Sequence, residues 1–183
     1  MLFRHAKSAW PDVPDHERPL ARRGLAEAPM MGHWLRSAGC VPDRVLCSTA
    51  RRARQTWQFA ETGLGASPPV SYERGVYGAS AAELLDLVRP APAATRTLLV
   101  IGHDPGIKEL ALALAAAGPA DDAHTGAVPA ATLDRVRAKF PTAAIAVLEF
   151  TGPWSRLGPG RARITSFVTP RDVGARNAES RPR

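Results

Sequence analysis

The sequence predicts one α/β domain: a layered α/β/α sandwich around a largely parallel central sheet with an antiparallel edge strand. Two segments support this fold class because each joins a short apolar strand directly to a helical pattern, residues 44–64 and 97–118. Residues 143–150 and 161–170 are two strand-like runs without a convincing helix between them, which favours an antiparallel pair at the sheet edge. With 183 residues, 45% of them apolar, the chain has room for one sizeable core.

The first half of the chain contains two predicted strands and two predicted helices. Residues 1–3 form the end of a buried strand that is short for a central position, so we expect part of its N-terminal half to be missing from this sequence. Residues 20–38 have helical spacing, which Pro29 should kink or interrupt. Residues 44–48 form the next strand, and residues 49–64 continue as a helix.

The strongest strand and the best helix signals lie in the middle of the chain. Ser80 and Glu83 have the spacing of a capping box, which predicts a short helix from there to residue 88. Residues 97–103 form the strongest buried strand. Asp104 is suited to cap the helix that follows, and Gly118 is suited to end it.

The last third of the chain defines the predicted domain boundary. Residues 117–129 are typical of a loop, and Pro170 should end the last strand. Residues 171–183 are polar and rich in arginine, without periodicity. We therefore predict a domain over 1–170 and a disordered C-terminal tail over 171–183.

Composition limits the location and the partners. The chain has no apolar run long enough to span a bilayer and no secretory signal, so we expect a soluble, cytoplasmic protein without a membrane partner. The formal net charge of +7 favours anionic partners, and nucleic-acid binding is one hypothesis that this charge allows. The basic stretch RPLARRG, residues 18–24, lacks interleaved aromatic residues, so we expect no nucleic-acid partner.

Two histidines lie at the ends of predicted strands. His5 comes at the end of the first strand, and His103 is the last residue of the strand over 97–103. Ligands of open α/β sheets bind beyond the carboxyl ends of the strands, so both imidazoles belong to that edge. The helix that begins after His103 would also point its free N–H groups at an anion held there.

Arginines belong to the same predicted edge. Arg4 precedes the first histidine, and Arg51, Arg52 and Arg54 lie in the first turns of the helix after residue 48. Guanidinium groups match phosphoryl oxygens with two parallel hydrogen bonds and keep their charge, so this composition predicts a phosphate site. Composition does not choose among the three arginines of the helix.

Three motifs in this order resemble those of a known family. They are RHAKS at residues 4–8, S-x-x-x-R-A-x-Q-T at residues 48–56 and GHDPG at residues 102–106. Together they resemble the motifs of the histidine phosphatase superfamily, which has the phosphoglycerate-mutase-like fold. Residues 139–150 and 167–172 are most similar to the small SixA-type branch, which is named for phosphohistidine phosphatases.

The resemblance implies a role for each matching residue. His5 would be the nucleophile that accepts the phosphoryl group, and Arg4 and Arg52 would hold the phosphoryl oxygens. His103 would supply charge and a hydrogen bond, and Ser8, where the family usually has threonine, would add a hydroxyl contact. The motif therefore selects Arg52 over its neighbours, and the predicted substrate-binding set is Arg4, Ser8, Arg52 and His103.

Elementary electrostatics agrees with this scheme. A histidine nucleophile must be neutral at one nitrogen, and nearby cations disfavour its protonation. Preplaced cations and helix N–H groups stabilise the charge on the transferred group, so the scheme needs no metal and no cofactor. Water would then attack the phosphohistidine and release inorganic phosphate.

The general acid stays open at this stage. Glu73 lies in YERGVYG, which resembles a mutase stretch whose glutamate protonates the leaving oxygen, but Glu73 could equally pair with Arg74 at the surface. Asp104 is the competing candidate, and an N-cap role is its other interpretation. A weak acid would favour a protein phosphohistidine over a small phosphoester, because a protonated imidazole leaves readily.

An alternative function is a non-catalytic module that binds phosphate or a phosphoprotein on the same fold. His16, His33 and His124 lack paired ligands in the sequence, so we assign them no role. Trp10 either packs near the nucleophile or contacts the substrate.

Overall fold

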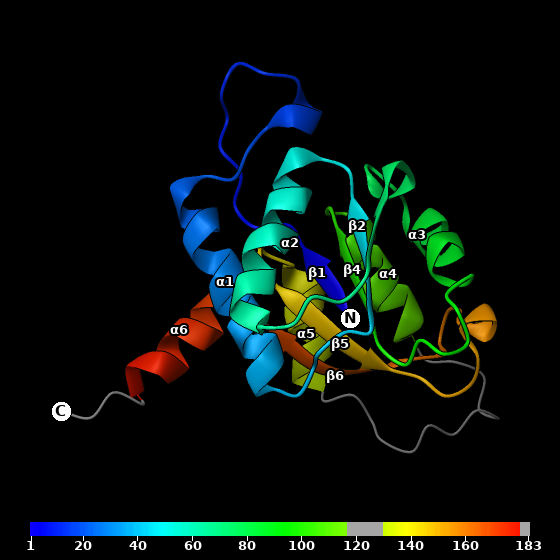
Figure 1. Ribbon diagram of the computed structural model, residues 1–183. Helices are drawn as coiled ribbons and strands as arrows, with labels where there is room; N and C mark the ends of the chain where they lie inside the picture. Colours follow the sequence, from blue (N-terminus) through cyan, green and yellow to red (C-terminus); the bar gives the residue numbers. More distant parts are fainter. Residues whose placement is uncertain (117–129, 180–183) are drawn as a thin grey trace.

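The computed structural model describes residues 1–116 and 130–179 (Figure 1). Its strands are β1 (Leu2–Arg4), β2 (Arg44–Ser48), β3 (Val70–Glu73), β4 (Leu98–Gly102), β5 (Ile145–Glu149) and β6 (Arg163–Val168). Its α-helices are α1 (Arg22–Ser37), α2 (Arg51–Leu64), α3 (Ala81–Val88), α4 (Gly106–Leu114), α5 (Ala130–Ala138) and α6 (Pro170–Glu179). Three single 3-10 turns are η1 (Asp15–Glu17), η2 (Arg74–Val76) and η3 (Trp154–Arg156). The loop predicted over 117–129 lies outside the described residues, as does His124.

The six strands form one sheet in the order β3-β2-β4-β1-β5-β6. Neighbouring strands from β3 to β1 are parallel, whereas β5 runs antiparallel to both β1 and β6. The predicted α/β fold with a largely parallel sheet is therefore confirmed, and so is the antiparallel pairing of the last two strands. Because β1, β2 and β4 are adjacent and parallel, their carboxyl ends lie side by side at one edge.

Helices cover both faces of the sheet, as the sandwich prediction requires (Figure 1). Alternate strand residues point to opposite faces. Leu98 and Val100 pack with α3, α4 and α5, while Leu99 and Ile101 pack with α1, α2 and α6. The two apolar cores fix the sheet, and therefore the strand ends that carry the site.

Local signals gave some helix boundaries correctly. Ser80 and Glu83 form the expected capping box at the start of α3. Strand β6 ends at Val168, two residues before Pro170, as predicted. Pro29, however, does not interrupt α1, which runs unbroken across it and packs against α2.

Two further predictions need correction. Asp104 does not cap α4: Pro105 occupies the N-cap position without a side-chain cap, and the Asp104 carboxylate lies 3.7 Å from the Arg4 guanidinium. The tail predicted to be disordered from residue 171 instead begins as helix α6, anchored by Val173, which is buried in the core beside α1. Residues 180–183 lie outside the described residues.

Candidate active site

The two motif histidines meet at the carboxyl edge of the sheet. His5 comes directly after β1 and His103 directly after β4, and these strands pair in parallel with Arg4 opposite Gly102. Their ring centroids are 5.1 Å apart, and each residue is less than 10% exposed. The fold thus brings together two imidazoles that are almost a hundred positions apart in the chain.

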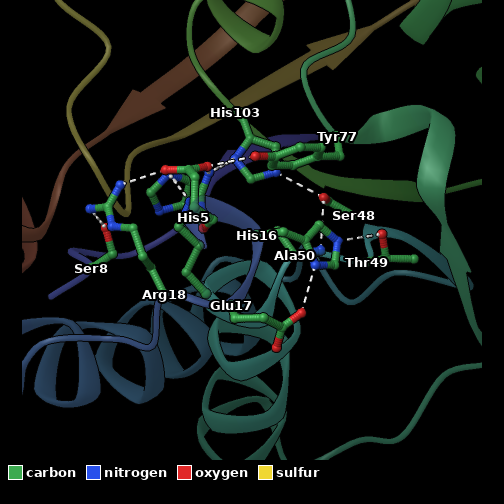
Figure 2. Close-up of polar contacts among 12 residues, drawn as sticks. His5, Ser8, His16, Glu17, Arg18, Ser48, Thr49, Ala50, Tyr77 and His103 are labelled. Carbon is green, nitrogen blue, oxygen red and sulfur yellow. Dashed lines mark hydrogen bonds and ion pairs between the residues drawn. The ribbon is translucent and has the colours of Figure 1, made fainter. Parts of the chain in front are cut away.

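Arg52 joins the two imidazoles (Figure 2 shows both rings). It lies in the first turn of α2, which begins just past the carboxyl end of β2, so its side chain reaches back over the strand ends. Its Nε donates to His5 Nε2 at 3.3 Å, and its Nη2 donates to His103 Nδ1 at 3.4 Å. This arginine is buried, whereas its neighbours Arg51 and Arg54 are exposed.

A backbone carbonyl determines the tautomer of His5. The Nδ1 atom lies 2.8 Å from the carbonyl oxygen of Ala6, which can only accept, so Nδ1 carries the proton. The lone pair of neutral His5 is therefore on Nε2, the nitrogen that faces Arg52. Because Nε2 is the unprotonated nitrogen, it is the one that can act as a nucleophile.

The tautomer of His103 follows from the same reasoning. Its Nδ1 accepts from Arg52, which can only donate, so the proton is on Nε2. That N–H donates to Ser48 Oγ at 2.8 Å, and the same hydroxyl accepts from the backbone N–H of Ala50 at 3.3 Å (Figure 2). Ser48 at the end of β2 therefore orients the second imidazole.

Burial and positive charge keep both imidazoles neutral. Burial is the main cause that lowers the pKa of His5 to about 3; the neighbouring His103, Arg52 and Arg4 act in the same direction, and the hydrogen bond to Ala6 opposes the shift. Burial, followed by Arg52, lowers the pKa of His103 to about 4. At pH 7 the free site therefore holds two uncharged rings beside arginine.

A carboxylate from a loop faces the same arginine. Asp15 Oδ2 accepts from Arg52 Nη2 at 3.0 Å and from the Tyr77 hydroxyl at 2.6 Å, and its Oδ1 accepts from Arg18 Nη1 at 2.8 Å. The hydrogen bonds from Tyr77 and Arg18 hold the pKa of Asp15 well below its usual range. The carboxylate is therefore charged at neutral pH.

Arg4 is the last residue of β1 and directly precedes His5. Its Nη1 donates to the carbonyl oxygen of Phe140 at 2.6 Å and lies 3.7 Å from Asp104. Its Nε is buried and has no hydrogen-bond partner among the described residues. This N–H donor and the positive charge of Arg4 fit an anion better than a neutral ligand.

The comparisons with known proteins agree with this geometry. The sequence profile of the histidine phosphatase superfamily (branch 1) matches residues 1–76. An uncharacterized protein of Mycobacterium tuberculosis is 44% identical over 170 residues, which cover 92% of this chain and all of that protein. A Nakamurella multipartitia structure assigned as a phosphohistidine phosphatase SixA is 33% identical, with a TM-score of 0.77, and the match covers 92% of this chain and 95% of that chain. The chain belongs to the histidine phosphatase superfamily, in its SixA-type branch.

Further solved structures show the same fold. One from Agrobacterium tumefaciens, also assigned as SixA, is 27% identical with a TM-score of 0.71 over 92% of this chain and 95% of that chain. A protein histidine phosphatase SixA complexed with tungstate is 23% identical with a TM-score of 0.67, over 94% of this chain and 97% of that chain. The predicted resemblance to this superfamily and its SixA-type branch is therefore confirmed.

The structure places some of the predicted site residues together and others apart. Arg4, His5, Arg52 and His103 lie together, as described above. Ser8 is also buried, and its hydroxyl oxygen accepts from Arg18 Nη2 at 2.8 Å, which leaves its O–H able to donate; the predicted contact with the substrate stays a prediction (Figure 2).

Glu73 does not join the imidazoles. It is the last residue of β3, where it lies opposite Ser48 of the neighbouring strand β2, and its side chain is exposed. Together with Arg44 and Asp86 it lines a groove of about 320 Å³ beside α3. Neither Glu73 nor the Arg4-bound Asp104 contacts either imidazole, so the geometry gives no direct support to either as the general acid.

Sequence reasoning missed four residues that surround the site. Asp15 and Arg18 come from the loop before α1, and Tyr77 packs edge-on against His103 with ring centroids 5.3 Å apart. His16, to which we assigned no role, lies edge-on against Tyr77 at 5.0 Å and contacts Thr49 Oγ1 at 3.0 Å (Figure 2). The only available signal was that Tyr77 belongs to the same YERGVYG stretch as Glu73.

Two further features bear on ligands. Among residues 1–116 and 130–179, no three His, Cys, Asp or Glu side chains are grouped so that they could hold a metal ion. In the same residues, no helix combines the length and the apolar character that crossing a membrane requires.

Proposed function

We propose that this chain is a metal-independent phosphatase that transfers a phosphoryl group to His5 and then to water. The observation that carries the proposal is the fixed lone pair of His5 Nε2, which lies beside Arg52 and His103 in a buried, cationic setting. The superfamily to which the chain belongs supports phosphatase activity in general.

The first step is attack of His5 Nε2 on phosphorus. A bond forms between Nε2 and phosphorus, and the bond between phosphorus and the leaving group breaks with its electron pair going to the leaving group. The ring becomes cationic, and its Nδ1–H donates to the Ala6 carbonyl oxygen, which stabilises that charge. Arg4, Arg52 and His103 would hold the phosphoryl oxygens.

The second step is attack of water on the phosphohistidine. The new oxygen–phosphorus bond forms, the bond to Nε2 breaks, and inorganic phosphate leaves with the neutral imidazole restored. His103, neutral in the free protein, would gain basicity next to a phosphoryl dianion, because an opposite charge favours the protonated ring.

The leaving group narrows the substrate class. An alkoxide needs a proton from a nearby acid, whereas the imidazole of a phosphohistidine leaves once solvent has protonated it. Because Glu73 lies apart from the imidazoles and Asp104 pairs with Arg4, we favour a protein phosphohistidine over a small phosphoester. The phosphohistidine phosphatase SixA assignments of the similar structures support the same choice.

The test compares wild type with His5→Ala on an aryl phosphate and on a phosphorylated histidine-containing domain. His33→Ala is the matched control, because His33 is exposed on α1. We expect turnover in wild type and in the control, and its loss in His5→Ala. Undiminished turnover in His5→Ala would remove His5 from the mechanism, and binding of vanadate without turnover on any substrate would favour the non-catalytic binding module.

A second experiment addresses the acid. Glu73→Gln and Asp104→Asn are each assayed on phosphoesters whose leaving groups span a range of pKa values. A variant that slows only the poor leaving groups identifies the acid. If both variants hydrolyse all esters at the wild-type rate, neither residue is the acid, which would support a substrate such as a phosphohistidine, whose leaving group solvent can protonate.

A further inference from the structure

The loop between β1 and α1 carries a carboxylate into the arginine cluster of the site. Residues 10–18 form the blue loop with one short helical turn that projects at the top of Figure 1. Its Asp15 contacts Arg52, Arg18 and Tyr77. We propose that Asp15 is an internal competitor for the phosphoryl site: its carboxylate occupies Arg52 in the resting protein and must leave before a phosphoryl group can bind.

The hydrogen bonds of Arg52 show why the two anions exclude each other. A guanidinium has five N–H bonds. One goes to His5, one to His103, one to the Asp15 carboxylate at 3.0 Å and one to the Asp15 carbonyl oxygen at 2.6 Å. Asp15 thus takes one N–H bond on Nη1 and one on Nη2, and a phosphoryl group that binds this pair of nitrogens with two parallel hydrogen bonds takes the positions that Asp15 now occupies.

The position of Asp15 allows this exchange. Its side chain is 50% exposed, whereas that of Arg52 is 8% exposed, so the carboxylate can move into solvent while the arginine stays in place. The loop is tied at its base, where Ala9 N–H donates to Pro19 O at 2.9 Å. Inside the loop the backbone hydrogen bonds are local, such as Glu17 N–H to Pro14 O, so the tip can shift without breaking the sheet.

The remaining contacts give Asp15 a role in specificity. Tyr77 and Arg18 each donate to the carboxylate, so a weakly interacting monoanion gains too little at Arg52 to replace it. A phosphoryl dianion offers more charge and more acceptor oxygens to the same donors. Asp15 thus selects doubly charged tetrahedral anions, and it would also help to expel the product phosphate.

The inference rests on the proposed function, because it assumes that the site binds phosphoryl groups. The test is calorimetric titration of wild type, Asp15→Asn and Asp15→Ala with inorganic phosphate at fixed ionic strength. Asp12→Asn is the matched control, because Asp12 is an exposed acid of the same loop and its replacement changes the net charge equally. We expect both Asp15 variants to bind phosphate about tenfold more tightly than wild type, and Asp12→Asn about as tightly as wild type.

Whether phosphate affinity rises or falls in the Asp15 variants decides whether Asp15 competes with phosphate or positions Arg52. If Asp15 only positions Arg52, its removal weakens phosphate binding, and weaker or unchanged binding relative to Asp12→Asn overturns the inference. In wild type, the side-chain carboxyl carbon resonance of Asp15 should shift as phosphate is added, and a resonance that stays fixed while phosphate binds also overturns it. Failure of all the proteins to bind phosphate would instead overturn the proposed function.

Discussion

Acidification from pH 7 to pH 5 should lower the free energy of unfolding by about 4 kcal/mol through His5 and His103 alone. Both rings are less than 10% exposed, and burial is the main cause that lowers their pKa values, to about 3 and about 4. In the unfolded chain both have ordinary pKa values near 6.5.

The direction follows from where the protons bind. Below pH 6.5 the unfolded chain takes up a proton at each histidine while the folded protein does not, so acid favours unfolding until the pH nears the folded pKa values. At about 1.5 pH units below the unfolded pKa, each histidine lowers the free energy of unfolding by about 2 kcal/mol, because one pKa unit corresponds to 1.36 kcal/mol. The two losses add because in the unfolded chain the rings titrate independently.

Urea unfolding followed by tryptophan fluorescence at pH 7 and pH 5 measures this loss. The matched protein is the double variant His5→Gln/His103→Gln, which keeps His16, His33 and His124. Between pH 7 and pH 5, the free energy of unfolding of wild type should fall by about 4 kcal/mol more than that of the double variant. If both proteins lose the same amount, the two imidazoles are not buried as neutral groups and the argument for a poised nucleophile fails.

Three other predictions concern the site and the core. Arg52→Lys should lower kcat on an aryl phosphate at least about 100-fold, because an ammonium cannot bridge both imidazoles and hold a phosphoryl group; steady-state kinetics measures it, and a smaller loss would argue against that role. The pH profile of kcat/KM, corrected for ionisation of the substrate, should show no falling limb near pH 6.5, because the pKa of His5 in the free protein is about 3; a limb centred there would contradict the burial argument. Gly32→Ala should destabilise the protein by about 2 to 3 kcal/mol in urea unfolding, because the new methyl group would overlap the carbonyl oxygen of Ala60 on α2. Gly174→Ala on α6 meets open space and should not destabilise it.

The central part of the site was predictable because topology alone determines it. His5 and His103 each follow an apolar run that reads as a buried strand, and parallel strands place such residues at one edge. The selection of Arg52 depended on the family motif, because composition does not distinguish it from Arg51 and Arg54. The structure separates them physically: the first turn of α2 buries Arg52 and leaves the other two exposed.

Asp104 shows how a tertiary charge overrides a local capping signal. An aspartate before proline is a good N-cap by sequence, but α4 begins one residue later, with Gly106 as its first residue. The carboxylate faces Arg4, which comes from the end of β1. The sequence around Asp104 contains no information about that arginine, so local rules could not place the carboxylate.

Helix α6 was missed although its signal was present. Thr169 and Asp172 have capping-box spacing with Pro170 at the first helical position. In the structure Asp172 accepts from the N–H and the hydroxyl of Thr169, and Arg135 pairs with it at 2.7 Å. Polar composition predicted disorder, but one buried side chain, Val173, together with this cap fixes the start of the helix.

The loop over residues 10–18 was beyond sequence reasoning for a different reason. It has no hydrophobic periodicity, and its shape comes from contacts with distant elements. Arg18 stacks on the exposed ring of Trp10 at 3.2 Å from its centroid and reaches Ser8. These contacts, together with Arg52 of α2, bring Asp15 to the site, and none of them is visible as a local pattern.

Asp15 also explains how the resting site tolerates its arginines. Arg18 and Arg52 lie close together and largely buried, and the carboxylate between them offsets their mutual repulsion. Asp15→Asn should therefore lower the melting temperature in the absence of phosphate, and a saturating phosphate concentration should restore it, because phosphate replaces the missing charge at the same donors. A variant that is less stable alone but gains more stability from phosphate than wild type does is the combination that competition for Arg52 requires. A loss of stability that phosphate does not restore would mean that Asp15 holds the loop in place and does nothing at the phosphoryl site.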